Sequence, residues 1–153
     1  MIRKALKSDA DAIADVISES NYLAYRSIIP GKYFKHPVVT REEILSDMEK
    51  MVFYVYEVKG EIVGVAAIHP VPNEGVGIVR WVYAHPKHQR RGVGTSLMKC
   101  VEEEGRKMGL KKLRLVVHEK AFWAIKFYEK LGFKIVARVD RAAWRDNVME
   151  KTL

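Results

Sequence analysis

Residues 85–98, HPKHQRRGVGTSLM, place positive charge and two glycines directly before an apolar pattern with helical spacing. The glycines at positions 92 and 94 leave the backbone N–H groups open to a ligand, because they have no side chain. A helix that begins there adds the positive end of its dipole, which favours a bound anion. The segment therefore predicts a phosphate site, and the net charge of +8 suits a polyanionic ligand.

Two common phosphate-binding loops do not fit this segment. A Walker A loop ends in Gly-Lys-Ser or Gly-Lys-Thr, but Gly94 is followed by Thr95 and Ser96 with no lysine. A dinucleotide-binding loop needs a small residue where Leu97 stands, and its glycine turn follows a strand directly, whereas residues 86–91 intervene here. The glycines alone leave the phosphate ligand open.

The pattern around the glycines resembles that of a known family. Gln89-x-x-Gly92-x-Gly94 follows the strand residues WVYAHP and opens a helix, and it resembles motif A of the GNAT superfamily of acyl-CoA-dependent N-acetyltransferases. Residues 124–133, AIKFYEKLGF, resemble motif B of the same family. One helix and one strand separate the two motifs, as in the family, and the resemblance is strongest over residues 79–133.

The resemblance implies that acetyl-CoA is the co-substrate. Backbone N–H groups between Gln89 and Thr95 would hold the CoA pyrophosphate, with neighbouring basic side chains balancing its charge. The strand before the loop would splay from the next strand and pair with the pantetheine arm of the cofactor. The implied cofactor-binding residues are Val82, Tyr83, Ala84, Gln89, Arg90, Arg91, Gly92, Val93, Gly94 and Thr95.

The resemblance also implies direct transfer of the acetyl group from the thioester to a primary amine. Tyr128 stands at the family's general-acid position, where its phenol would protonate the departing thiolate; a core tyrosine is the alternative. For the general base we place His118 and Glu119 first, because they follow the strand beside the splayed one, and water reached through one of them is a further alternative. The family often has asparagine three residues before Ala124, where this chain has Ala121.

The acceptor amine stays open between a small molecule and the N-terminus or a lysine of a protein. We expect residues 22–34, 71–75 and 138–147 to form the acceptor face. Their aromatic side chains would either wall a small pocket or pack under the long loops. These aromatic residues are Tyr22, Tyr25, Tyr33, Phe34 and Trp144.

The sequence leaves one alternative to an enzyme and argues against nucleic-acid and metal binding. A non-catalytic acyl-CoA-binding regulatory module is the alternative to an enzyme. The basic charge also suits nucleic acid, but the chain lacks a basic sheet face with interleaved aromatics and a recognition-helix motif, so we expect no such partner. The five histidines show no metal-ligand spacing with cysteine or carboxylates, so we expect no metal site. A homodimer is one open alternative for the oligomeric state.

Length and composition indicate one soluble domain over residues 1–153. The chain is 48% hydrophobic and 30% charged, as ordinary globular proteins are. No apolar run approaches a membrane span, and the N-terminus has no secretory apolar core. The single Cys100 cannot form an internal disulfide, which suits a reducing compartment, so we expect a cytoplasmic protein. Because no apolar run is long enough to span a membrane, we expect no membrane partner.

The elements that must position these residues follow from hydrophobic spacing and helix caps. One helix is expected to begin at Ser8 with Asp11 in its capping box, and another at Thr40 with Glu43 in its own. The order of elements predicts an α/β (α+β) domain with a mixed sheet in three layers. The resemblance adds a mostly antiparallel central sheet, helices on both faces and splayed central strands. Strands are expected at 2–5, 52–58, 62–68, 76–84, 112–117, 133–139 and 148–152, with the later helices at 93–108 and 121–131.

Overall fold

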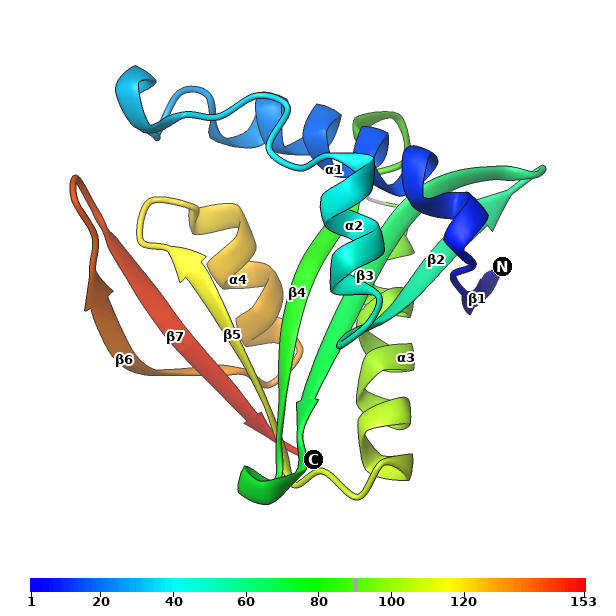
Figure 1. The fold of residues 1–153 in the computed structure, drawn as a ribbon. Helices are drawn as coiled ribbons and strands as arrows, with labels where there is room; N and C mark the ends of the chain where they lie inside the picture. The colour runs from blue at the N-terminus through cyan, green and yellow to red at the C-terminus, as the bar shows by residue number, and fades with distance from the viewer. Residues whose placement is uncertain (90) are drawn as a thin grey trace.

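The computed structural model describes residues 1–89 and 91–153. Within them, one seven-stranded sheet has the strand order β1-β2-β3-β4-β5-β7-β6 (Figure 1). All neighbouring strands are antiparallel except β4 and β5, which are parallel. The strands are β1 (Ile2–Lys4), β2 (Val52–Val58), β3 (Glu61–Val71), β4 (Val76–Ala84), β5 (Lys112–His118), β6 (Lys134–Asp140) and β7 (Arg145–Thr152). The helices are α1 (Ala10–Tyr25), α2 (Arg41–Asp47), α3 (Val93–Lys107) and α4 (Phe122–Lys130).

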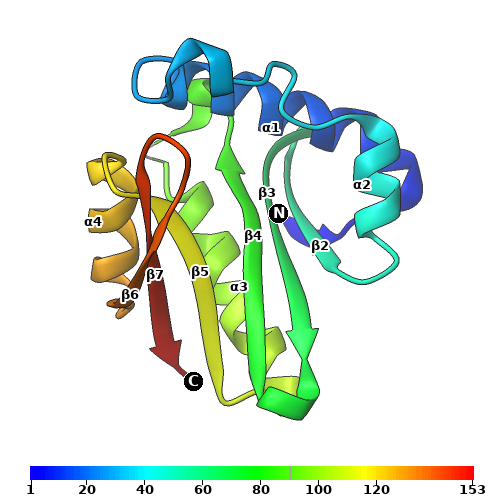
Figure 2. The ribbon, with the colours of Figure 1, turned by 60° about the vertical axis from the view of Figure 1, so that its left-hand side comes forward.

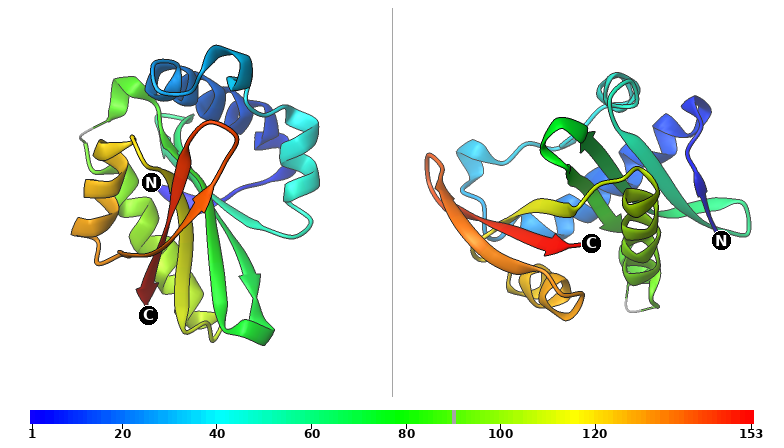
Figure 3. Two further views of the ribbon diagram at one scale, coloured as in Figure 1. Left: turned by 90° about the vertical axis from the view of Figure 1, so that its left-hand side faces the viewer. Right: turned by 90° about the horizontal axis from the view of Figure 1, so that it is seen from below.

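The sheet lies between two layers of helices, each of which covers its own hydrophobic core (Figure 3). Helices α1 and α2 bury Ile13, Ile17 and Ile44 against one face of the sheet. Helices α3 and α4 cover the other face, where Leu97 packs with Phe133. The predicted three-layer, mostly antiparallel fold with helices on both faces is therefore confirmed. Among the described residues, no helix is both long and apolar enough to cross a membrane.

Two strands are longer than their apolar patterns predict. Strand β3 continues to Val71, three residues beyond the expected end at Ile68. Strand β7 begins at Arg145, three residues before the expected Val148. Its first residues are polar, but each pairs with a residue of β6, so the backbone ladder rather than side-chain burial defines this part of the strand.

One of the two predicted capping boxes is present. At the start of α2, the Glu43 N–H donates to Thr40 Oγ1 (3.2 Å) and the Thr40 N–H donates to Glu43 Oε1 (3.3 Å). The prediction for α1 is wrong, because the helix begins at Ala10 after a short 3₁₀ turn. Asp9 accepts the Leu6 N–H (2.7 Å) in place of the expected box at Ser8.

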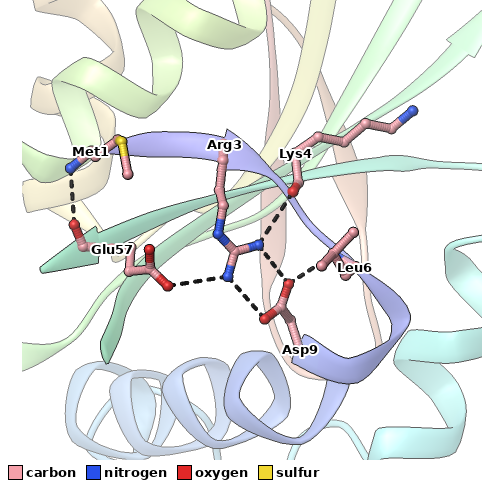
Figure 4. Close-up of polar contacts among 6 residues, drawn as sticks. All are labelled: Met1, Arg3, Lys4, Leu6, Asp9 and Glu57. Atoms are coloured by element: carbon pink, nitrogen blue, oxygen red, sulfur yellow. Dashed lines mark hydrogen bonds and ion pairs between the residues drawn. The ribbon is translucent and has the colours of Figure 1, made fainter. Parts of the chain in front are cut away.

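Asp9 also anchors the N-terminal strand to the rest of the molecule (Figure 4). The Arg3 guanidinium on β1 donates to both carboxylate oxygens of Asp9, at 2.7 and 3.0 Å. The same guanidinium reaches Glu57 Oε1 on β2 (3.2 Å), and the N-terminal amine donates to the Glu57 carbonyl (2.9 Å). Since the guanidinium hydrogen bonds favour the ionised form, they hold the pKa of the Asp9 carboxyl below its usual range.

Replacing Asp9 with asparagine should lower the free energy of unfolding by about 1–3 kcal/mol at neutral pH, because a partly buried charged hydrogen bond is lost. The lowered pKa means that this stabilisation is present above the ordinary carboxyl pKa of about 3.9 and is lost as the pH falls through the folded-state value. Urea unfolding of both proteins from pH 7 down to pH ~2 tests this, since the difference should shrink only at the acid end. Asp11→Asn is the matched control, because that side chain is 78% exposed. An equal loss in both variants would contradict the prediction.

Candidate active site

The parallel strands β4 and β5 pair over only a short stretch. Val76, Gly77 and Ile78 face residues 112–114 in register, and the two strands then diverge toward their C-terminal ends (Figure 2). Beyond Ile78, no strand in the described part of the chain pairs with the edge of β4 that faces β5. The predicted splay is thus present between these two strands. Unpaired backbone N–H and C=O groups at a sheet edge can bind another extended chain.

A β-bulge shapes the splayed part of β4. Ala67 pairs with Arg80 and Val65 pairs with Tyr83, so two residues, Trp81 and Val82, lie opposite a single residue of β3. Trp81 has a φ of +56°, in the left-handed region that a bulky residue rarely adopts. Its indole Nε1–H donates to Asp47 Oδ2 of α2 (3.0 Å), which holds the strained residue in place.

The end of β4 turns its backbone toward the gap. The His85 N–H donates to the Val63 carbonyl (2.7 Å), so the next pair, Gly64 and Ala84, is a non-hydrogen-bonded pair. The N–H and C=O of Ala84 therefore point away from β3. The Ala84 carbonyl accepts hydrogen bonds from Ser20 Oγ of α1 (3.1 Å) and from Gln89 Nε2 (3.2 Å).

The contacts from α1 were not predicted from the sequence. Asn21 Nδ2 donates to the Tyr83 hydroxyl (2.9 Å), and both Ser20 and Asn21 are more than nine-tenths buried. Their positions continue the spacing of the buried residues Ile13 and Ile17 along the helix. The sequence signal that could have revealed these contacts is the presence of polar residues on the buried side of α1, because a buried polar group needs a hydrogen-bond partner.

The glycine segment forms the N-terminus of α3. Gly92 is the N-cap residue with a φ of +77°, and the helix runs from Val93. The first helical N–H groups have no carbonyl partner within the helix, while the Ser96 N–H already bonds to the Gly92 carbonyl (2.9 Å). The free N–H groups and the helix dipole make this end attractive to an anion. Of the predicted basic neighbours, Arg91 is exposed here and Arg90 lies outside the described residues.

Gly94 and Thr95 lie in the first turn of α3, both partly exposed. A Cβ on Gly94 would lie 3.2 Å from the Phe127 ring of α4. The absent side chain thus allows α3 and α4 to approach each other at this turn, a use of the glycine that its sequence pattern did not indicate.

Tyr128 of α4 is buried at the splayed side of the sheet, with 8% of its surface exposed. Its ring packs edge-on against Phe133 at a centroid distance of 5.7 Å. Burial raises the pKa of Tyr128 well above its ordinary value, and the nearby phenols of Tyr25 and Tyr83 raise it further. These three tyrosines come from α4, α1 and β4, and at neutral pH each holds its proton.

His118 is the last residue of β5, and only 6% of its surface is exposed. Its Nδ1 accepts the Lys120 N–H (3.0 Å), and its ring stacks on Trp144 at a centroid distance of 5.2 Å. Burial lowers the pKa of the imidazole, although Asp146 opposes this effect. The neutral ring then has its proton on Nε2, which has no partner among the described residues.

This arrangement leaves His118 without a free nitrogen lone pair in the neutral state. The adjacent Glu119 is half-buried, and its N–H donates to the Arg145 carbonyl (3.0 Å). A role as proton acceptor would require the other tautomer of the His118 ring, and the base roles of both residues stay predictions.

Aromatic side chains gather where the acceptor face was expected. They meet in pairs: Tyr22 with Phe34 (6.1 Å), Tyr33 with Trp144 (6.1 Å) and Tyr25 with Trp123 (5.7 Å), measured between ring centroids. Tyr33 thereby links the segment after α1 to the turn between β6 and β7. On α4, Phe122 and Trp123 are 66% and 49% exposed, so neither is fully packed. In residues 1–89 and 91–153, no group of three or more His, Cys, Asp or Glu side chains could hold a metal ion.

Comparison with known proteins agrees with this geometry. The profile of the acetyltransferase (GNAT) family matches residues 17–133, more than half of the chain. The chain belongs to the GNAT acetyltransferase family. The resemblance of its two motifs to that family is thereby confirmed.

Individual relatives differ in the acceptor that their names state. An amino-acid acetyltransferase of Ralstonia nicotianae is 37% identical over 89 residues, which are 58% of this chain and 20% of the relative. The matched part of this chain thus spans about a fifth of the length of that amino-acid acetyltransferase. The peptidyl-lysine N-acetyltransferase YiaC of Escherichia coli is 29% identical over 153 residues, with 99% of this chain and 92% of the relative covered.

Solved structures share the fold over the whole chain. The PaiA N-acetyltransferase of Thermoplasma acidophilum, solved in complex with coenzyme A, matches with a TM-score of 0.82 and 22% identity. The match covers 100% of this chain and 98% of that protein. The ribosomal-protein-S18-alanine N-acetyltransferase of Escherichia coli matches with a TM-score of 0.79 and 18% identity, covering 99% and 92% of the two chains.

Replacing Gly92 with alanine should cost about 1–2 kcal/mol of stability, because a side chain disfavours the left-handed conformation. The strain should also misdirect the first N–H groups of α3 and weaken acetyl-CoA binding by about tenfold or more. Thermal denaturation and calorimetry measure the two effects separately. Gly109→Ala is the matched control, since Gly109 has a similar φ of +79° at the other end of α3. The control should lose stability and keep its affinity; an equal loss of affinity in both would count against the anion site.

Proposed function

We propose that this chain transfers the acetyl group of acetyl-CoA to a primary amine. The observation that carries the proposal is the gap between β4 and β5, which opens beside the N-terminus of α3 and has Tyr128 on α4 next to it. A helix N-terminus that suits an anion, a strand edge without a strand partner among the described residues and a buried phenol thus lie in one region. Membership of the family and the coenzyme A complexes of structural neighbours support the same activity.

In this proposal, the cofactor lies along the splayed edge of β4. Its pyrophosphate accepts hydrogen bonds from the first N–H groups of α3, with Arg91 and the neighbouring basic side chains balancing the charge. Its pantetheine arm pairs with the backbone of β4 between Val82 and Ala84. Because Ser20 and Gln89 already occupy the Ala84 carbonyl, the Ala84 N–H is the group left for the cofactor.

The acetyl transfer needs no covalent enzyme intermediate. The neutral amine attacks the thioester carbonyl, the carbon–sulfur bond breaks, and the CoA thiolate takes a proton from the Tyr128 phenol. The new amide nitrogen gives up a proton, which returns to the phenolate, so the net proton moves from amine to thiol. Burial keeps the Tyr128 phenol protonated at neutral pH and disfavours the phenolate, so the phenol gives up its proton only as the thiolate leaves and regains one from the amide nitrogen.

The acceptor enters from the side of the aromatic pairs in this proposal. The segment after α1 and the turn between β6 and β7 meet there through Tyr33 and Trp144. Glu119, directly or through water, accepts the proton of an ammonium acceptor before attack. The amino-acid and peptidyl-lysine acceptors of the relatives are both primary amines, and both remain candidates.

Acetyl-CoA binding is the first test of the proposal. Calorimetry should detect binding of acetyl-CoA and desulfo-CoA, with much weaker binding of ATP, because the β4 edge recognises the pantetheine arm that ATP lacks. If neither CoA species binds at low salt, the cofactor site is wrong. Binding without turnover of any amine tried would favour the non-catalytic acyl-CoA-binding module.

Replacing Tyr128 with phenylalanine should lower kcat by about 10²–10⁴-fold, the usual contribution of a general acid, with little change in acetyl-CoA affinity. Steady-state kinetics with the best amine found, together with calorimetry, measure both quantities. Tyr54→Phe is the matched control: Tyr54 is also buried and its pKa is raised to about 12, but it lies on β2. Unchanged kcat in the Tyr128 variant would remove its role as the acid.

A further inference from the structure

The bulge in β4 is anchored from outside the sheet by a carboxylate of α2. Trp81 has a φ of +56°, and its indole Nε1–H donates to Asp47 Oδ2 (3.0 Å). A residue with a bulky side chain is strained in this conformation, so the anchor opposes its return to a regular strand. Asp47 is the last residue of α2, where the negative end of the helix dipole disfavours a carboxylate. The stability of α2 therefore does not explain the placement of Asp47.

Hydrogen bonds before the bulge show which way the backbone of β4 faces. The Gly75 carbonyl accepts the Lys112 N–H of β5 (3.2 Å), so it points toward β5. The Val76 N–H belongs to the same trans peptide and points the other way, toward β3. Because backbone groups alternate between the two edges of a regular strand, those of Arg80 also point toward β3, where Arg80 pairs with Ala67.

The backbone beyond the bulge is fixed in the same way. The pair of Gly64 and Ala84 is non-hydrogen-bonded, so the neighbouring pair of Val65 and Tyr83 exchanges hydrogen bonds. The backbone groups of Tyr83 thus face β3, as those of Arg80 do. Two residues, rather than the single residue of a regular strand, lie between these two positions.

The N–H groups of both bulge residues therefore face the gap between β4 and β5. The Trp81 N–H shares a trans peptide with the Arg80 carbonyl, so it points away from β3. A left-handed residue turns the next N–H to the same side, as in the backbone concavities that bind anions. The Val82 N–H consequently points into the gap beside the Trp81 N–H. In a regular strand, the two groups would point to opposite edges.

In the proposed acetyl transfer, the thioester carbonyl oxygen becomes negatively charged as the amine attacks. Backbone N–H groups stabilise such a charge when they are held in the correct direction before the reaction. We propose that Asp47 is a positioning residue for this transfer: its bond to the Trp81 indole holds the bulge so that the N–H groups of Trp81 and Val82 face the thioester oxygen. The inference rests on the proposed function and adds a residue of α2 that acts through Trp81.

The other contacts of the indole define the variants that test this role. The Arg80 guanidinium lies over the Trp81 ring at 4.9 Å, and the ring packs against the core under α1 and α2. Phenylalanine at position 81 keeps an aromatic ring but lacks the N–H that binds Asp47. Glycine lacks the ring as well, but it adopts the left-handed conformation without strain and needs no anchor. The two substitutions therefore separate packing from backbone direction.

Steady-state kinetics, together with calorimetry of acetyl-CoA, test the positioning role. Asp47→Ala and Trp81→Phe should each lower kcat by about 10- to 100-fold, because a misplacement of about 1 Å can cost about 10²-fold. KM for the amine and the affinity for acetyl-CoA should change by less than about threefold, since the N–H groups act on charge that forms during the reaction. Asp47→Asn keeps an oxygen acceptor and should restore most of kcat. Glu49→Ala, exposed in the turn after α2, is the matched control and should behave as the wild type.

Trp81→Gly gives the sharpest comparison. It removes more of the side chain than Trp81→Phe, so a purely structural role would make it the more damaging change. If backbone direction decides the rate, Trp81→Gly should lower kcat by less than about threefold, and adding Asp47→Ala should lower it no further. Thermal denaturation shows which variants are folded in the assay. A folded Trp81→Gly variant as slow as Trp81→Phe, or Asp47→Ala with the wild-type kcat, overturns the proposal.

Spectroscopy tests the same role without turnover. Hydrogen bonds to the thioester oxygen lower its carbonyl stretching frequency, so infrared spectra of bound, isotope-labelled acetyl-CoA should show a smaller shift in Asp47→Ala and the full shift in Asp47→Asn. In the ligand-free protein, NMR should show the Trp81 indole and Val82 amide signals moving in Asp47→Ala and not in Glu49→Ala. Unchanged signals, or an unchanged carbonyl band, overturn the positioning role.

These outcomes separate the positioning role from the proposed function. If the wild type transfers acetyl groups and Asp47→Ala is unchanged, the positioning role alone is wrong. If the wild type binds acetyl-CoA and acetylates no amine, the proposed function is wrong, and the carbonyl band of the bound thioester still decides whether Asp47 directs the bulge.

Discussion

The structure depends on the point where β4 and β5 stop pairing. Three residues of each strand are in register, and beyond Ile78 the two halves of the sheet separate. A separated parallel pair leaves backbone groups without partners, which is costly unless another group satisfies them. The chain meets part of this cost at the end of β4 with Ser20 and Gln89, which both bond to the Ala84 carbonyl.

The strained bulge in β4 belongs to the same constraint. A left-handed tryptophan costs stability, and it persists because α2 holds its indole through Asp47. Helix α1 supports Tyr83, two residues further along β4, through the bond that Asn21 donates to its hydroxyl. Two helices on one face of the sheet therefore hold the irregular part of β4, whose edge away from β3 faces the gap.

Burial determines the protonation of the groups around the gap. Tyr25, Tyr83 and Tyr128 are held in their neutral form because a phenolate would be poorly solvated there. The same effect keeps His118 neutral beneath Trp144. A region rich in neutral donors suits a reaction that produces a thiolate. Near this region, the β6–β7 hairpin contributes Trp144 at its turn and β6 at the sheet edge.

The sequence by itself determined the order of elements, the start of α3 at the glycine segment, and the family. Hydrophobic spacing, the Thr40 cap and the glycines at 92 and 94 are local signals, because a helix start or a turn depends on residues that are neighbours in the chain. The same signals failed at Asp9 and at the start of β7. The partners in these two places belong to other elements. Arg3 of β1 bonds to Asp9, and β6 pairs with the first residues of β7.

Only the tertiary structure decided the bulge at Trp81, the role of Ser20 and Asn21, and the state of His118. Each depends on contacts between segments far apart in the chain, such as the 34 residues that separate Asp47 from Trp81. The stack of His118 on Trp144 and the free edge of β6 likewise follow from strand order and register. These are properties of the assembled sheet, and hydrophobic spacing along one strand does not specify which strand will lie beside it.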